Sequence, residues 1–170
     1  TMTQTDQTDR QTSGQDVALI VGGGPGISAS CARLFSENGL RVAVAARNPD
    51  KPVLEALEET HGIRRYTCDA SEPASVEWLF QEVVRDLGMP TLVVHNIDGR
   101  VLDILRKSIT DADPALALGV VRNSAFSAFL IGQQAARLML GKQPNANGAK
   151  GTIVFTNASA ALKGFPLSAA

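Results

Sequence analysis

One stretch of this chain, residues 17–46, constrains its fold more than any other. It opens with the apolar run VALIV (17–21), which predicts a fully buried strand because it is continuously apolar and bounded by glycine. Four glycines then follow within five positions: Gly22, Gly23, Gly24 and Gly26. Glycine lets a backbone turn tightly and approach a ligand without a Cβ in the way.

The chain becomes helical from Ile27, and a second apolar strand is predicted at 41–46 (RVAVAA). The helix that begins at Ile27 directs its free N–H groups and positive dipole end into the glycine turn, where a phosphate would bind. Strand, glycine turn, helix and strand within about 30 residues are typical of a dinucleotide-binding βαβ unit. The plain alternative is a glycine-rich turn that binds nothing.

Strands and helices alternate along the rest of the chain. Further strands are predicted at 63–68, 91–95 and 151–156, and helices at about 26–38, 50–61, 72–87 and 112–140. This alternation predicts an α/β fold, a doubly wound parallel sheet of Rossmann-like type with strand order 3-2-1-4-5. Residues 1–15 are rich in Thr, Gln and Asp and predict a disordered tail, which leaves 16–170 as one domain.

Composition excludes several classes of function. The net charge of −1 argues against a nucleic-acid partner, which would require a basic patch. No apolar run approaches the length of a membrane span, and the N-terminal stretch lacks the apolar segment of a signal peptide. Cys31 and Cys68 have neither metal-ligand nor redox-pair spacing, so we expect reduced core thiols, no metal site and a cytoplasmic location.

The glycine spacing carries a family resemblance. Gly22-x-x-x-Gly26-Ile27 resembles the T-G-x-x-x-G-I-G turn of the short-chain dehydrogenase/reductase family, with Val21 for the Thr and Ser28 for the last Gly. The resemblance covers about residues 16–166, so we expect the C-terminal part of the family fold to be absent from this sequence. It implies an NAD(P)-dependent oxidoreductase acting on a small-molecule carbonyl or alcohol, and a homo-oligomer built through helix 112–140.

The resemblance implies cofactor-binding roles for eight residues: Gly22, Gly24, Gly26, Ile27, Arg47, Asp69, Ala70 and Asn96. The second strand ends at Ala46 without the acidic residue that would bind the ribose hydroxyls of NAD. Because Arg47 comes next, we expect a preference for NADP, with NAD as the alternative. Asp69 either lies near the adenine or is only the N-cap of the following helix.

The segment after the fourth strand, His95-Asn96-Ile97-Asp98, resembles the family's N-N-A-G segment with Asn96 retained. Ile97 and Asp98 replace a small residue and a glycine, and their bulk and negative charge disfavour the fit of a cofactor. We expect His95 to be a strand-end residue rather than a catalytic base.

Two further sites are displaced by one residue from the family pattern. In helix 112–140 the position of the family's active-site Asn falls on Ser124, with Asn123 one residue early. One residue is about 100° of helix, so Asn123 would point elsewhere unless the register slips. After the fifth strand, the position of the family's catalytic Ser falls on Ala158, and Ser159 is the candidate substitute.

The family's proton-donating Tyr-x-x-x-Lys pair has no counterpart in this sequence, because its one tyrosine, Tyr66, has no lysine four residues later. Two hypotheses follow: the cofactor-binding portion of an NADP-preferring reductase, or a catalytically silent nucleotide-binding or scaffold protein. A methyltransferase using S-adenosylmethionine is disfavoured, because that cofactor's ribose also requires an acid near Ala46.

Overall fold

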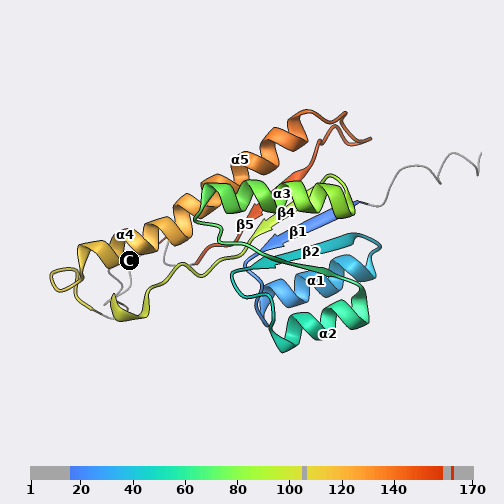
Figure 1. The fold of residues 1–170 in the computed structure, drawn as a ribbon. Helices are drawn as coiled ribbons and strands as arrows, with labels where there is room; N and C mark the ends of the chain where they lie inside the picture. Colours follow the sequence, from blue (N-terminus) through green and yellow to red (C-terminus); the bar gives the residue numbers. More distant parts are fainter. Residues whose placement is uncertain (1–15, 105–106, 159–161, 163–170) are drawn as a thin grey trace, which may run out of the picture.

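The computed structural model describes residues 16–104, 107–158 and 162. The strands form one sheet in the order β3-β2-β1-β4-β5, and each pairs in parallel with its neighbours (Figure 1). The strands are β1 (Val17–Val21), β2 (Arg41–Ala46), β3 (Arg64–Thr67), β4 (Leu92–His95) and β5 (Thr152–Phe155). The predicted doubly wound fold and its strand order are confirmed.

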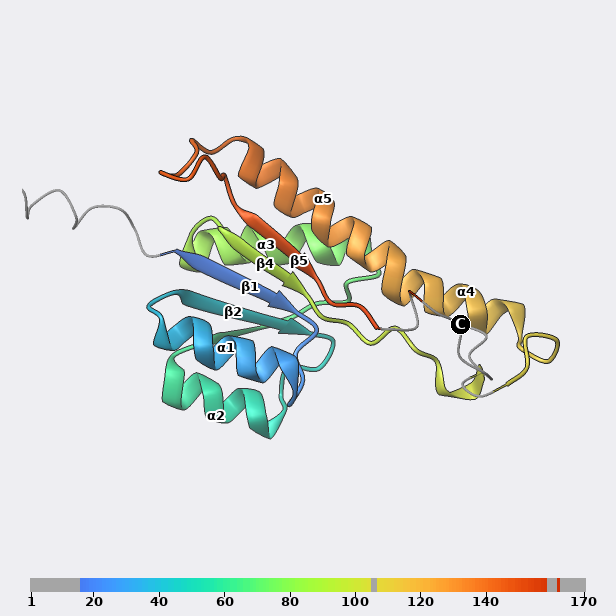
Figure 2. The same cartoon turned by 180° about the vertical axis from the view of Figure 1, so that it is seen from behind.

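Helices cover both faces of the sheet. The helices α1 (Ile27–Glu37) and α2 (Pro52–His61) lie on one face, and α3 (Pro73–Leu87) and α5 (Ser127–Leu140) lie on the other (Figures 1 and 2). The central strand β1 is buried on both sides: Ile20 packs with the α1 and α2 cluster, and Leu19 with the α3 and α5 cluster. This position explains why its sequence is continuously apolar rather than alternating.

The predicted helix 112–140 is one helical rod in three parts. Its first part, α4 (Pro114–Val121), leads through a π-helical turn (Arg122–Phe126) into α5. Asp113 caps the rod by accepting the N–H of Ala115 at 2.7 Å. No α4 residue is buried, and α4 runs out beyond the sheet (Figure 2).

The length of this rod corrects one expectation. The continuous helix Pro114–Leu140 has 27 residues and a mean hydropathy of 1.5, so by length and composition alone it is long enough to cross a membrane. Polar residues such as Asn123 interrupt the apolar run in the sequence, but they do not interrupt the helix. Its α5 half packs on the sheet through buried side chains that include Ile131 and Ala135.

Candidate cofactor-binding site

A cavity of about 630 Å³ lies at the carboxyl ends of the strands. All eight predicted cofactor-binding residues line it: Gly22, Gly24, Gly26, Ile27, Arg47, Asp69, Ala70 and Asn96. They come from the segments that follow β1, β2, β3 and β4, which the parallel sheet brings together at one edge. In open α/β sheets ligands bind at this edge, where the strand order reverses.

Two glycines of the turn pack closely against the protein itself. Gly22 has a φ of +106°, and a Cβ there would lie 2.0 Å from the carbonyl oxygen of Asn96. A Cβ on Gly23 would lie 2.9 Å from the Cδ1 of Leu54. The N–H groups of both glycines donate to the carbonyl of Ala45, at 2.9 and 3.0 Å. These contacts fold the turn tightly onto β2.

The other two glycines leave room for a ligand. A Cβ on Gly24 or Gly26 would have no atom within 4 Å. Helix α1 begins at Ile27, and its N-cap, Gly26, provides no side-chain hydrogen bond. The first N–H groups of a helix have no partner within the helix, so this end can bind an anion such as a pyrophosphate.

Ser28 and Asn96 hold the glycine turn in place. The Oγ of Ser28 donates to the carbonyl of Gly22 at 2.6 Å, and the Nδ2 of Asn96 donates to that Oγ at 2.7 Å. The Oδ1 of Asn96 accepts from the Oγ1 of Thr156 at 2.9 Å. Asn96 therefore ties the turn to the ends of β4 and β5. Sequence reasoning treated Ser28 only as a substitute for glycine and missed this contact.

The wall beyond β2 carries positive charge. Ala46 is buried at the end of the strand, and the exposed Arg47 lines the cavity with Asn48 and Lys51. The Nζ of Lys51 donates to the carbonyl of Gly23, which places this second cation across the turn. Lys51 was not predicted as a site residue. It is the N-cap of α2 and matches no position of the family's motifs. Two cations on one wall favour a phosphate over a neutral hydroxyl.

Asp69 forms a turn of its own rather than a helix cap. Its Oδ1 accepts from the N–H of Ser71 at 3.0 Å and from the Oγ of Ser71 at 2.7 Å, whereas the N-cap of α3 is Glu72. The N-cap alternative is therefore wrong. Partial burial acts to raise the pKa of Asp69, but the Ser71 hydrogen bonds and the nearby Arg47 outweigh it and lower that pKa. Asp69 is thus a carboxylate at neutral pH.

The two unusual residues after Asn96 both line the cavity. Ile97 is partly buried and packs against the core. The carboxylate of Asp98 accepts from the Nε of Arg100 at 2.8 and 3.0 Å, and these hydrogen bonds lower the pKa of Asp98. Its negative charge is therefore paired with Arg100, and the expectation that Ile97 and Asp98 disfavour cofactor fit stays a prediction.

The π-helical turn shifts the helix register at Asn123. The N–H of Ser127 donates to the carbonyl of Arg122, five residues earlier, and Asn123 lines the cavity. The Oγ of Ser124 instead donates to the carbonyl of Val120 at 2.6 Å within the helix. Asn123 would point elsewhere in a regular helix, and the register slip brings it to the site.

His95 supports this turn from the sheet. Its buried Nε2 lies 2.8 Å from the Oγ of Ser127, which in turn lies 2.7 Å from the carbonyl of Asn123. Burial lowers the pKa of His95, so the imidazole is neutral at pH 7. His95 lies at the end of β4, as predicted, and is not among the residues lining the cavity.

The remaining candidates lie elsewhere. Ser159, the predicted catalytic residue, lies outside the described residues, and the preceding Ala158 is exposed. Tyr66 donates its hydroxyl to Asp86 at 3.1 Å, and burial raises its pKa to about 12. Within the part of the chain that the structure describes, no group of three or more His, Cys, Asp or Glu side chains could hold a metal ion.

A parallel sheet of order 3-2-1-4-5, with a glycine turn before α1 and a cavity where the strand order reverses, defines a Rossmann-like nucleotide-binding protein. A family model described as enoyl-(acyl carrier protein) reductase matches residues 22–170. The chain belongs to the short-chain dehydrogenase/reductase family of oxidoreductases, as the glycine turn predicted.

Several relatives and solved structures are similar to this chain. Short-chain dehydrogenase reductase ATA1 of Arabidopsis thaliana is 30% identical over 150 residues, covering 88% of this chain and 52% of the relative. Tropinone reductase-like 1 of Erythroxylum coca is 30% identical over 146 residues, covering 83% of this chain and 50% of the relative. The structure of an actinorhodin polyketide ketoreductase variant with NADPH is 26% identical in sequence, with a TM-score of 0.76. The match covers 89% of this chain and 56% of the ketoreductase chain. The chain thus spans about half the length of these relatives.

Proposed function

We propose that this chain supplies the cofactor site of an NADP(H)-preferring reductase that acts on a small-molecule carbonyl or alcohol. The observation that carries the proposal is the cavity wall beyond Ala46, where Arg47 and Lys51 stand in place of an acid. A carboxylate there would bind the ribose hydroxyls of NAD, whereas cations favour the 2′-phosphate of NADP. The NADPH in the similar ketoreductase structure supports the same choice.

Each part of the cavity suits one part of that cofactor, which supplies the hydride when bound. The open Gly24 and the start of α1 at Ile27 would hold the pyrophosphate. Asp69 and Ala70 would border the adenine, while Asn96 holds the turn from behind and Asn123 lines the cavity from the π-helical turn. We assign Ser159 the hydrogen bond to the substrate carbonyl.

Titration with NADPH and NADH, followed by cofactor fluorescence, tests the preference. We expect NADPH to bind more tightly, and Arg47→Ala to weaken NADPH alone, because about 1–3 kcal/mol of charge-assisted hydrogen bonding to the phosphate is lost. Arg33→Ala, which removes an exposed cation of α1 outside the cavity, is the matched control. Equal affinities for the two cofactors, or an Arg47→Ala variant that binds NADPH like wild type, contradict the proposal.

A catalytically silent nucleotide-binding protein is the second candidate. Ala158 at the position of the family's serine favours it. Sequencing the coding region beyond Ala170 separates the two. A Tyr-x-x-x-Lys about a dozen residues further on supports the reductase, and its absence supports the silent protein.

A further inference from the structure

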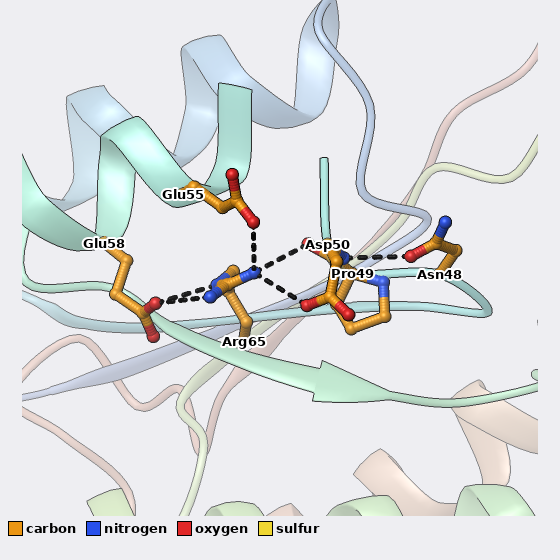
Figure 3. A network of polar contacts seen from close by, with 6 residues as sticks. All are labelled: Asn48, Pro49, Asp50, Glu55, Glu58 and Arg65. Atoms are coloured by element: carbon orange, nitrogen blue, oxygen red, sulfur yellow. Dashed lines mark hydrogen bonds and ion pairs between the residues drawn. The ribbon is translucent and has the colours of Figure 1, made fainter. Parts of the chain in front are cut away.

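Arg65 of β3 connects several groups through one guanidinium (Figure 3). Its Nε donates to the Oε2 of Glu58 at 2.8 Å. Its Nη1 lies 3.2 Å from the carbonyl oxygen of Pro49, 3.0 Å from the Oδ1 of Asp50 and 3.7 Å from the Oε1 of Glu55. The side chain of Arg65 is only 20% exposed.

The segment that Arg65 contacts is also a wall of the cofactor cavity. Residues 47–51 connect β2 to α2, and three of them, Arg47, Asn48 and Lys51, line the cavity. The two residues between Asn48 and Lys51, which are Pro49 and Asp50, contact Arg65. One short loop therefore presents two cations to the ligand and is held from behind by the β3 arginine.

The charges around Arg65 bear on how well the cavity can bind a phosphate. Three carboxylates converge on the guanidinium of Arg65, from Asp50, Glu55 and Glu58. Without Arg65, the carboxylate of Asp50 would be free to pair with Lys51 or Arg47, and those cations would then be less available to a phosphate. The fork of an arginine binds several oxygens at once, which the single ammonium of a lysine does less well.

We propose that Arg65 is a positioning residue that sets the preference for a 2′-phosphorylated cofactor. It holds the loop 47–51 so that Arg47 and Lys51 face the ribose site, and it keeps the Asp50 carboxylate away from them. Arg65 is not among the residues that line the cavity, so it acts through the loop. This role rests on the proposed NADP(H) preference.

The test compares the dissociation constants of NADPH and NADH for Arg65 variants. For Arg65→Gln we expect the NADPH constant to rise about fivefold more than the NADH constant. Arg65→Lys keeps the charge but not the fork, so we expect a smaller change. Arg64→Gln is the matched control: it removes a cation from the same strand, one that lies 3.8 Å from Asp86, and should leave the ratio unchanged.

A second measurement separates positioning from general destabilisation. In a variant that already lacks Arg47 and Lys51, Arg65→Gln should no longer change the NADPH to NADH ratio, because it acts through those cations. Far-UV circular dichroism checks folding, and Arg65→Lys carries the test if Arg65→Gln does not fold.

The remaining outcomes separate failure of the Arg65 role from failure of the proposed function. Equal weakening of both cofactors, or a ratio that still changes without Arg47 and Lys51, overturns the role of Arg65. A wild-type preference for NADPH that survives the Arg65 substitutions also overturns it, while the proposed function stands. A wild-type chain without that preference overturns the proposed function, and the role of Arg65 with it.

Discussion

At the scale of single residues, the glycine turn shows that neighbouring glycines have different roles. Gly22 combines a positive φ with a backbone contact to Asn96, whereas Gly24 faces open space. The first is needed for folding, because any Cβ would overlap the backbone of Asn96, which follows the neighbouring strand β4. The second is needed only where a ligand approaches closely.

Alanine substitutions should separate these two roles. We expect Gly22→Ala to lower the free energy of unfolding by more than about 3 kcal/mol, because it adds strain at positive φ to a backbone overlap. Gly24→Ala should change it by less than about 0.5 kcal/mol and instead weaken NADPH binding. Urea unfolding followed by circular dichroism, together with cofactor titration, measures both effects. A Gly22→Ala variant as stable as wild type would contradict the packing seen at Asn96.

At the scale of elements, the π-helical turn and the end of β4 form one unit. His95 connects them through Ser127, and the turn's extra residue brings Asn123 to the cavity. Such turns are rare within α-helices and often occur at functional sites. The unit depends on a neutral imidazole in a buried position, so its stability should respond to pH.

The sign of that response follows from His95. Burial lowers its pKa below the ordinary value of 6.5, so unfolded His95 binds a proton at a higher pH than folded His95. The free energy of unfolding should therefore fall as the pH drops from about 7 towards the folded pKa. Urea unfolding at several pH values should show that His95→Gln removes this part of the slope. His61→Gln, which changes the second of the chain's two histidines, should leave it in place.

At the scale of the whole molecule, α5 and β5 present an apolar surface. Phe129 is 57% exposed and Phe155 is 49% exposed, and both border a groove with Gly132. In the described part of the chain, β5 pairs only with β4, so it lies at the sheet edge. An exposed apolar patch beside an open strand edge favours association with other chains.

We expect the 170-residue chain to self-associate as its concentration rises. Phe129→Lys should reduce this association without changing NADPH binding, because Phe129 does not line the cofactor cavity. Leu34→Lys on α1, at a similar exposure of 55%, is the control and should have little effect. Sedimentation velocity over a range of concentrations measures the change. A wild-type chain that stays monomeric throughout would show that the patch does not drive association.

The sequence by itself determined the order of the elements and the place of the cavity. Continuous apolar runs, helical periodicity and the glycine spacing are local patterns, and parallel strands joined by helices leave few topologies. Every predicted element therefore lies within two residues of its predicted ends. The predicted cavity-lining residues followed because they come from the segments that follow β1, β2, β3 and β4.

Only the tertiary structure decided which side chains meet. The register slip that brings Asn123 to the cavity depends on hydrogen bonds in the π-helical turn, which no spacing rule reveals. The Lys51 contact to Gly23 and the Arg65 network depend on how α2 and β3 pack beside the turn. Gly22 and Gly24 are the same letter in the sequence, and what separates their roles is the backbone of Asn96, more than seventy positions away along the chain.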